Sequence, residues 1–255
     1  MFGAIVGDIV GSAYEYHVVL DEDLPLLTPA SSYTDETVLT VAVADCLLHQ
    51  RPYGETLRAW ALANPGRRYS TRFAKWTEDP ERTMPTSYGN GAAGRVSPVG
   101  WAFDTLEETL AEARRSAEPT HNHADGIAGA QAVAAAVFLA RTGVSKDGIR
   151  DYLERTFRYD LRRSLIDCTG GWFEAAELSV PEAVICFLQS TDVRSSLQNA
   201  VNLRGDADTQ AAIAGSIAEA FYHGIPADLS GPCLAMLPAD FRSIIDEFRG
   251  RFHIV

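Results

Sequence analysis

The sequence predicts an all-α protein folded as a single domain, and three observations support this. Within several long segments, apolar residues recur at the period of an α-helix. Several of these segments stop at glycine or proline, and no alternating strand-like segments or hairpin turns separate them. The 255-residue chain is 46% hydrophobic, enough to bury a large core without disulfide or metal cross-links. No linker or internal repeat divides residues 1–255, so one compact multi-helix domain is expected.

The first elements are predicted from spacing. Glycine recurs at every fourth position, at Gly3, Gly7 and Gly11, which on a helix forms a smooth stripe. We therefore expect another backbone to approach this helix closely. Residues 36–49 have the apolar pattern of a largely buried helix, and residues 55–63 form the next.

Three longer helices are predicted further along the chain. Residues 104–117 place apolar and acidic side chains on different faces, as in an amphipathic helix. Residues 125–141 are alanine-rich and end before Gly143, as expected of a central core helix with a glycine cap. Residues 208–222 end before Gly224 and a proline, the usual stop signals.

Two stretches without clear periodicity, about residues 16–33 and 64–103, are predicted to be long irregular loops. Loops of this length in a helical domain are usually functional or disordered. The second contains Phe73, Trp76 and Trp101, which give it enough apolar surface to pack. We therefore expect it to be functional.

Charge and cysteine usage restrict the partners and the compartment. A formal net charge of −12 opposes binding to a phosphate backbone, so nucleic acid is an unlikely ligand. No basic leader precedes the first apolar run, and the most apolar stretch, residues 132–140, has about half the length needed to cross a bilayer. A cytoplasmic protein with no membrane association is expected. The cysteines lie far apart and are predicted to be buried thiols: Cys46, Cys168, Cys186 and Cys233.

Two short segments, residues 34–37 and 206–209, concentrate oxygen ligands directly before predicted helices. Taken singly, helix capping explains either one, because Thr and Asp are favoured caps and acids suit the first turn. Each segment, however, supplies two carboxylates and a hydroxyl within four residues. Such close like charges repel unless a cation neutralises them. The all-oxygen donor set suits Mg²⁺, Mn²⁺ or Ca²⁺ rather than zinc, and convergence of the two helix starts would create room for two ions.

Motifs along nearly the whole chain resemble the ADP-ribosylglycohydrolases, the family of dinitrogenase reductase-activating glycohydrolase and the ADP-ribosylhydrolases. They occur in the family's order: Gly7-Asp-Ile-Val-Gly-Ser-Ala-Tyr-Glu15, Tyr33-Thr-Asp-Glu-Thr37, Gly89-Asn-Gly-Ala-Ala-Gly-Arg-Val96, Thr120-His-Asn-His123 and Arg204-Gly-Asp-Ala-Asp-Thr209. The resemblance implies an all-α fold with a cleft that holds two divalent cations, Mg²⁺ or Mn²⁺.

By motif position, the resemblance assigns the metal ligands and the catalytic acids. The implied ligands are Thr34, Asp35, Glu36, Asp206, Asp208 and Thr209. Glu15 matches the acidic residue that the family uses in catalysis, and Asp35 and Glu36 join it as candidate catalytic residues. Without the resemblance, Glu15 would be interpreted as a solvated side chain at a helix end.

The glycine-rich segment 89–100 matches the family's ADP-ribose-binding loop. Glycines let backbone N–H groups approach a diphosphate, and Ser97 could add a hydroxyl donor. Neither a Walker sequence nor G-x-G-x-x-G is present, and the isolated His121/His123 pair lacks the further ligands that zinc needs. The candidate substrate-binding residues are Gly89, Asn90, Gly91, Ser97, Gly100, His121, Asn122 and His123.

The chain departs from the family pattern at three positions. The family usually has Thr-Asp-Asp where this chain has Glu36, a side chain one methylene longer. Gly94 replaces a common methionine, and Arg204 replaces the first glycine of Gly-Gly-Asp. We expect Glu36 to tune metal spacing and turnover, and the other two to affect substrate fit more than ligation.

The resemblance implies a metal-dependent hydrolase that cleaves the N- or O-glycosidic bond between ADP-ribose and an acceptor. The acceptor is expected to be a modified protein side chain or a small-molecule conjugate. Two alternatives remain open from the sequence. One is a catalytically weak ADP-ribose-binding protein of the same fold, which Glu36 favours and the retained acids oppose. The other is a hydrolase of another ribosylated small molecule.

Overall fold

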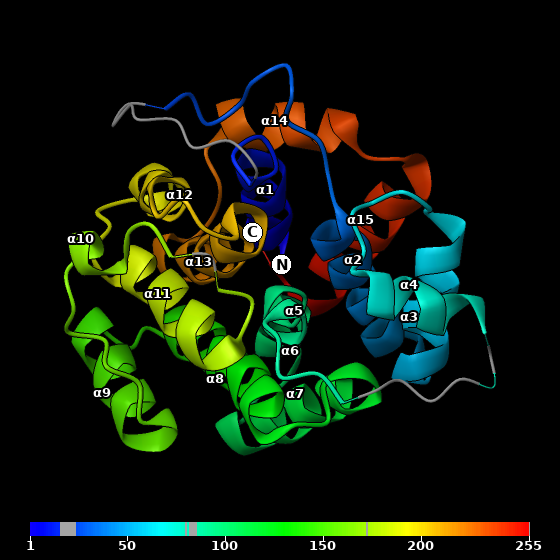
Figure 1. Cartoon of the computed structure of the whole chain (residues 1–255), viewed down its shortest axis with the longest axis horizontal. Helices are drawn as coiled ribbons and strands as arrows, with labels where there is room; N and C mark the ends of the chain where they lie inside the picture. The colour runs from blue at the N-terminus through cyan, green and yellow to red at the C-terminus, as the bar shows by residue number, and fades with distance from the viewer. Residues whose placement is uncertain (16–23, 80, 82–85, 172, 255) are drawn as a thin grey trace.

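A computed structural model describes residues 1–15, 24–79, 81, 86–171 and 173–254. Within these residues the chain forms helices and connecting segments, with one isolated antiparallel bridge between Gly89 and Ala175 and no strand (Figure 1). The all-α prediction is confirmed.

The helices are α1 (Phe2–Gly11), α2 (Asp35–His49), α3 (Tyr53–Ala63), α4 (Thr71–Glu78), α5 (Gly91–Gly94), α6 (Ser97–Ala102), α7 (Leu106–His121), α8 (Ala124–Arg141), α9 (Lys146–Phe157), α10 (Leu165–Cys168), α11 (Ala176–Leu188), α12 (Val193–Asn202), α13 (Ala207–Tyr222), α14 (Ala227–Met236) and α15 (Ala239–Phe252). Each helix that the periodicity predicts is present, with ends that differ by a few residues. The sequence analysis did not resolve α9, α11, α12, α14 or α15 individually.

Helices α1 and α13 pack backbone to backbone at the centre of the molecule. A Cβ on Gly3 would lie 2.2 Å from the Gly215 carbonyl oxygen, and one on Gly7 would lie 2.0 Å from that of Ala211. The predicted close approach is therefore confirmed. The order of these contacts makes the helices antiparallel, so the C-terminal end of α1 meets the N-terminal end of α13.

The remaining helices surround this pair. Helix α2 packs beside α1, α8 and α11 pack on α13, and α14 crosses one end of α1 (Figure 1). The last helix, α15, packs on α2, so elements from both ends of the chain interlock. The single domain over residues 1–255 stays a prediction.

Helix α8 is the one described helix that is long and apolar enough to cross a membrane by length and composition alone. Its 18 residues exceed the apolar stretch noted in the sequence, and 61% of that window is buried inside the molecule. It contacts α7, α13 and α6, as expected of a core helix.

The second predicted loop is wrong as an irregular segment, because α4, α5 and α6 form within it. Ser70 caps α4 by accepting a hydrogen bond from the Phe73 N–H at 3.3 Å, and Phe73 and Trp76 are buried. This local capping and packing outweighs the weak periodicity. Of the first predicted loop, residues 16–23 lie outside the described residues, and residues 24–34 are irregular as expected.

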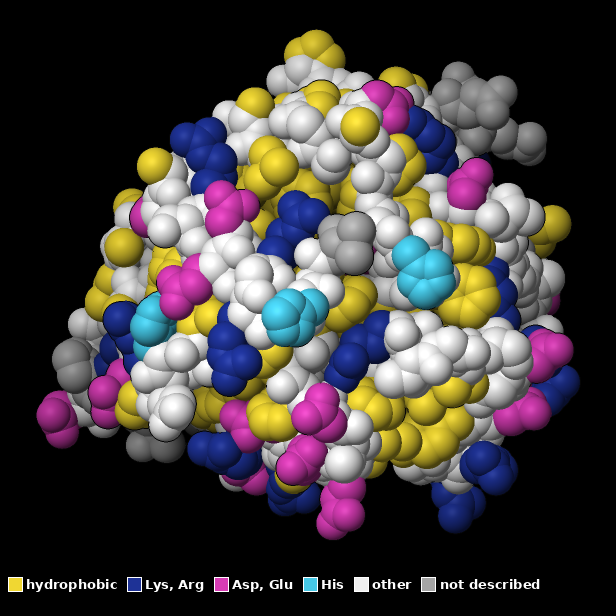
Figure 2. All heavy atoms as spheres, turned by 180° about the vertical axis from the view of Figure 1, so that it is seen from behind, with side chains coloured by type: hydrophobic (Ala, Val, Ile, Leu, Met, Phe, Trp, Pro, Cys, Tyr) yellow, Lys and Arg dark blue, Asp and Glu magenta, His cyan; other side chains and the backbone are white. Residues whose placement is uncertain are grey.

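The cysteines are buried free thiols, as predicted. Figure 2 shows the face opposite that of Figure 1, where basic and acidic side chains are interspersed among hydrophobic ones. No extended area of a single charge sign is visible on this face among the described residues.

Candidate metal centre

Three helix ends meet at the candidate centre: the C-terminal end of α1 and the N-terminal ends of α2 and α13. The glycine stripe brings the end of α1 against the start of α13. A Cβ on Gly11 would lie 2.2 Å from the Ala207 carbonyl oxygen and 2.5 Å from the Cα of Asp208. Asp8 of α1 holds the start of α2 beside α1 by accepting hydrogen bonds from its N–H groups. Both acidic segments thus adjoin α1.

A buried carboxylate cluster forms where α1 meets α13. Each of Glu15, Asp206 and Asp208 offers a carboxylate oxygen, and these oxygens lie within 4.8 Å of one another. Burial raises the pKa of Asp208 well above its ordinary value, and the charges of Asp206 and Glu15 raise it further. Burial also raises the pKa of Asp206. Such a cluster is costly to ionise without a cation.

The acids at the start of α13 cap the helix only in part, because Oδ1 of Asp208 accepts a hydrogen bond from the Thr209 N–H at 2.8 Å. Asp206 occupies the N-cap position but makes no side-chain capping bond within the described part of the chain. Its carboxylate accepts a hydrogen bond at 2.6 Å from Nδ2 of Asn90, which also donates to Oγ of Ser179 at 3.0 Å. Asn90, predicted to bind substrate, therefore holds a candidate metal ligand in place.

The Thr34 hydroxyl caps the start of α2, and the Asp8 carboxylate supports this cap. The Thr34 hydroxyl accepts from the Glu36 N–H at 3.3 Å and donates to Oδ1 of Asp8 at 2.6 Å. Oδ2 of Asp8 accepts from the Thr34 N–H at 2.8 Å, the Thr37 N–H at 3.1 Å and the Thr37 hydroxyl. Asp8 thereby fixes the orientation of the segment that carries Asp35 and Glu36.

Asp35 and Glu36 lie next to the cluster and are not members of it. Burial, followed by the charges of Asp8, Asp206 and Glu15, raises the pKa of Asp35 to about 8. Oε1 of Glu36 accepts a hydrogen bond from the Thr209 hydroxyl at 3.3 Å, which links the two acidic segments directly. Burial raises the pKa of Glu36 well above its ordinary value, and the Asp35 charge adds to this.

The Arg68 guanidinium holds the Glu15 carboxylate in place. Nη1 of Arg68 lies 2.5 Å from Oε2 of Glu15 and donates to the Ser12 carbonyl oxygen at 2.9 Å. Arg68 has a φ of 67°, a left-handed conformation that is uncommon for a non-glycine residue. Glu15 is thus a positioned group and not a solvated helix end.

The glycine-rich segment divides into two parts. Gly89, Asn90 and Gly91 adjoin the acidic cluster through the Asn90–Asp206 bond. Ser97 and Gly100 instead are buried residues of α6. A Cβ on Gly100 would lie 2.6 Å from the Cβ of Val137 in α8. Helix packing accounts for Gly100, and its ligand role stays a prediction, as does that of Ser97.

His121 is buried at the end of α7 as a neutral side chain. Burial, with the charge of Arg95, lowers its pKa to about 3. Arg95 donates to the Thr120 hydroxyl at 2.7 Å, so the Thr120 proton faces Nδ1 of His121 at 2.7 Å. The hydrogen-bond network therefore assigns the ring proton to Nε2. This atom lies 3.6 Å from where a Cβ on Gly91 would be.

The remaining predicted substrate-binding residues, Asn122 and His123, are exposed. Nδ1 of His123 accepts from the Asp125 N–H at 3.2 Å and caps α8. Its ring meets that of Tyr88 edge-on, with centroids 5.9 Å apart. The exposed Tyr88, which precedes Gly89 in the chain, thus brings His123 next to the Gly89–Gly91 segment.

The residues present fit a hard divalent cation. The donors are all oxygens, the cluster carboxylates are buried, and Oε2 of Glu36 is buried without a hydrogen-bond partner among the described residues. A buried, unpaired carboxylate oxygen is costly unless a ligand completes it. The chemistry matches Mg²⁺ or Mn²⁺ better than zinc.

Sequence analysis missed the residues that hold the ligands in place: Asp8, Arg68, Ser179 and Arg95. One of them had a visible signal, since Asp8 is the only charged residue in the apolar segment 2–11. The others act through tertiary contacts that no local pattern reveals.

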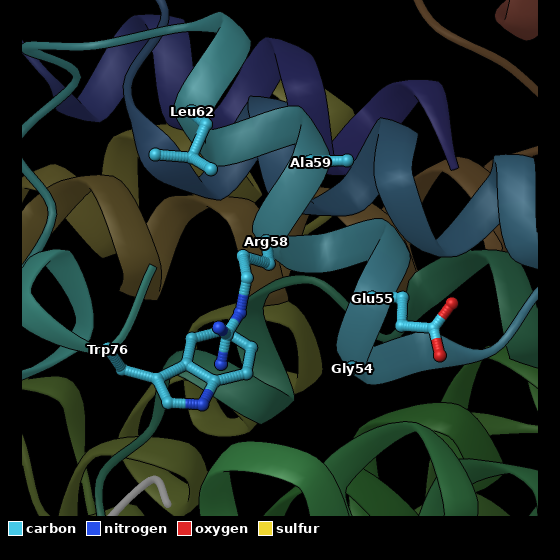
Figure 3. Close-up of a pocket in the computed structure, with 6 residues that line it drawn as sticks. All are labelled: Gly54, Glu55, Arg58, Ala59, Leu62 and Trp76. Carbon is cyan, nitrogen blue, oxygen red and sulfur yellow. The ribbon is translucent and has the colours of Figure 1, made fainter. Parts of the chain in front are cut away.

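A hollow of about 440 Å³ lies elsewhere, on the outer face of α3 and α4 (Figure 3). The Arg58 guanidinium covers the Trp76 ring there, 4.5 Å from its centroid, beside Leu62. None of the residues that line this hollow belongs to the candidate centre.

Comparison with known proteins identifies the class. A sequence model of the ADP-ribosylglycohydrolase family matches residues 1–253. ADP-ribosylhydrolase ARH3 of Mus musculus is 30% identical, over 86% of this chain and 82% of its own, and that of Homo sapiens is 29% identical, over 86% and 83%. A solved structure named ADP-ribosylglycohydrolase-related protein complex superposes with a TM-score of 0.74 at 26% identity, over 99% of this chain and 95% of its own.

The chain belongs to the ADP-ribosylglycohydrolase family. The resemblance noted in the sequence is confirmed, together with the fold that it implies.

Proposed function

We propose that this protein hydrolyses the N- or O-glycosidic bond that joins ADP-ribose to an acceptor, a modified protein side chain or a small-molecule conjugate. The observation that carries the proposal is the contact between Asn90 and Asp206 at 2.6 Å. It joins the glycine-rich segment to the Glu15–Asp206–Asp208 cluster. A bound ADP-ribose unit at Gly89–Gly91 would therefore have its ribose beside the carboxylates.

Two divalent cations, Mg²⁺ or Mn²⁺, are the proposed cofactors. Glu15, Asp206 and Asp208 would hold one, and Asp35, Glu36 and Thr209 would hold the other. Thr34 was predicted as a ligand too, but its hydroxyl already accepts from the Glu36 N–H and donates to Asp8. Bound cations supply charge stabilisation and a water of lowered pKa.

The chain's own groups would perform the remaining steps. The Glu15 carboxylate, oriented by Arg68, accepts the proton of the attacking water and passes it to the departing acceptor atom as the glycosidic bond breaks. The buried carboxylates favour the positive charge that develops on the ribose in an oxocarbenium-like transition state. The Nε2–H of His121 is a fixed donor next to Gly91, suited to a ribose or phosphate oxygen.

The direct test is release of free ADP-ribose from arginine-linked, serine-linked and nucleic-acid-linked conjugates, with Mg²⁺, Mn²⁺ or EDTA. We expect release from at least one protein-type linkage with a divalent cation and none with EDTA. Full activity in EDTA would contradict the metal role, and inactivity on every linkage would contradict the hydrolase.

The catalytically weak ADP-ribose-binding protein remains the second candidate, because Glu36 leaves Oε2 without a partner in the described residues. Glu36→Asp separates the two candidates. A hydrolase should keep its ADP-ribose affinity and change turnover moderately on this substitution. A native chain that is inert, with an active Glu36→Asp variant, would establish the binding protein.

The proposed location is the cytoplasm, where buried free thiols such as Cys46 and Cys186 persist in the reduced state.

A further inference from the structure

The carboxylate of Glu36 lies in the space that a side chain at position 94 would occupy. A Cβ on Gly94 would lie 2.0 Å from Oε2 of Glu36, 2.7 Å from its Cδ and 3.2 Å from its Oε1. Contacts this short cannot exist, so a side chain at position 94 and the observed position of Glu36 exclude each other.

Backbone conformation does not explain this glycine. Gly94 ends α5 and is absent from the residues with a left-handed φ, so alanine would fit its backbone. What Gly94 supplies is space for one particular side chain.

The surroundings leave the Glu36 carboxylate few alternatives. The residue is only 6% exposed, so it cannot turn into solvent without rearrangement. Its Oε1 is bound to the Thr209 hydroxyl at 3.3 Å and would lie 3.9 Å from a Cβ on Gly91. Its Oε2 is buried and has no hydrogen-bond partner within the described residues, which points to a bound ligand that contacts this oxygen.

We propose that Gly94 is a positioning residue for the metal centre: its missing side chain lets the long Glu36 draw back, so that Oε1 stays beside Thr209 without crowding the Glu15–Asp206–Asp208 cluster. This inference rests on the proposed function, in which Glu36 is a ligand. It also corrects the expectation that Gly94 affects mainly substrate fit, because the structure places Gly94 against a candidate metal ligand. The two departures from the family pattern compensate each other.

A double-mutant cycle tests the coupling, with Gly94→Ala and Glu36→Asp made singly and together. Mn²⁺ affinity is measured by titration calorimetry, and the melting temperature in EDTA. Gly94→Ala should lower Mn²⁺ affinity by about 10- to 100-fold, the usual cost of losing a group that orients a ligand. In the Glu36→Asp background the same alanine should change affinity by less than about threefold, because the shorter carboxylate leaves the space free.

Gly54→Ala is the matched control, since it adds the same methyl to a helical glycine whose Cβ would meet, among the described residues, only Pro119, at 3.6 Å. It should leave Mn²⁺ affinity unchanged. An equal loss from Gly94→Ala in both backgrounds would overturn the inference, because a purely structural glycine is not rescued by shortening Glu36.

Absence of Mn²⁺ binding by the unmodified chain would contradict the proposed function instead. The melting temperature then decides the inference alone. A fall of about 2–6 °C caused by Gly94→Ala only where Glu36 is present supports it, and an equal fall in both backgrounds overturns it.

Discussion

The two acidic helix starts, residues 34–37 and 206–209, have nearly the same composition but are built differently. At α2, Thr34 caps the helix and Asp8 accepts hydrogen bonds from Thr34 and Thr37, so part of the segment is structural. At α13, Asp206 forgoes the capping bond within the described residues, and its carboxylate joins Glu15 and Asp208. Hydrogen bonds to helix N–H groups thus occupy Thr34 and both oxygens of Asp8 at α2, whereas at α13 they occupy one oxygen of Asp208 and leave Asp206 without a capping bond.

The difference teaches where the metal affinity should reside. A carboxylate that satisfies helix N–H groups is already stabilised, whereas a buried cluster of carboxylates gains most from a cation. We therefore expect substitutions at α13 to act on metal binding and substitutions around the α2 cap to act on stability.

The largest expected effect is at α13. Asp208→Asn should lower Mn²⁺ affinity at least about 100-fold and abolish metal-dependent turnover, because it removes one of three clustered carboxylates. The melting temperature in EDTA should not fall, since the same change relieves repulsion from Asp206 and Glu15. Calorimetry and thermal unfolding measure the two effects. Unchanged Mn²⁺ binding would reduce the segment to a helix start without metal function.

Asp8→Asn should have the second largest effect, and on stability. The amide keeps a single carbonyl oxygen and turns an NH₂ group toward N–H and O–H donors, so it cannot replace a carboxylate that accepts from Thr34 and Thr37. We expect a loss of about 2–4 kcal/mol in urea unfolding. Asp206→Asn is the matched control, because it removes the same charge where no cap depends on it. A comparable loss from both would erase the distinction between the segments.

The pH dependence of the metal-free protein sharpens the comparison further. Burial and neighbouring charges raise the pKa of Asp35 to about 8, so the folded state holds a proton that the unfolded state releases near pH 4. The free energy of unfolding in EDTA should therefore fall as pH rises from about 4 to about 8.

Saturating Mn²⁺ should reverse that fall, because cation binding favours the ionised carboxylates. Unfolding curves at several pH values, with Asp35→Asn as the comparison, measure the effect. Stability in EDTA that rises over this range would contradict the raised pKa of Asp35.

The smallest expected effect concerns the cap itself. Thr34→Val removes the hydroxyl that accepts from the Glu36 N–H and should cost about 1–2 kcal/mol. Thr34→Ser keeps the hydroxyl and should cost only a few tenths, which makes it the control. Equal losses from valine and serine would show that the hydroxyl does not cap α2.

Local patterns predicted the frame of the molecule and part of its site. The glycine stripe of α1 correctly predicted a close helix contact, because residues four positions apart lie on the same face of a helix. Short helices were beyond this method: α5 spans four residues, less than the period needs to become visible.

The acidic residues were predicted as ligands, but their supports were not. Asn90 was assigned to the substrate, whereas its side chain also holds Asp206 from a distant part of the chain. Arg68 was not noticed, since its contact with Glu15 depends on how a connecting segment folds back over α1. Sequence indicates which side chains can ligate, and only the fold shows what orients them.

The central claim is that the acids at the start of α13 ligate a cation together with Glu15. Crystals grown with Mn²⁺ and measured for anomalous scattering test it most directly. We predict an anomalous peak about 2.0–2.6 Å from carboxylate oxygens of Glu15, Asp206 and Asp208, with a second beside Asp35, Glu36 and Thr209. A map without a peak among these side chains would contradict the account.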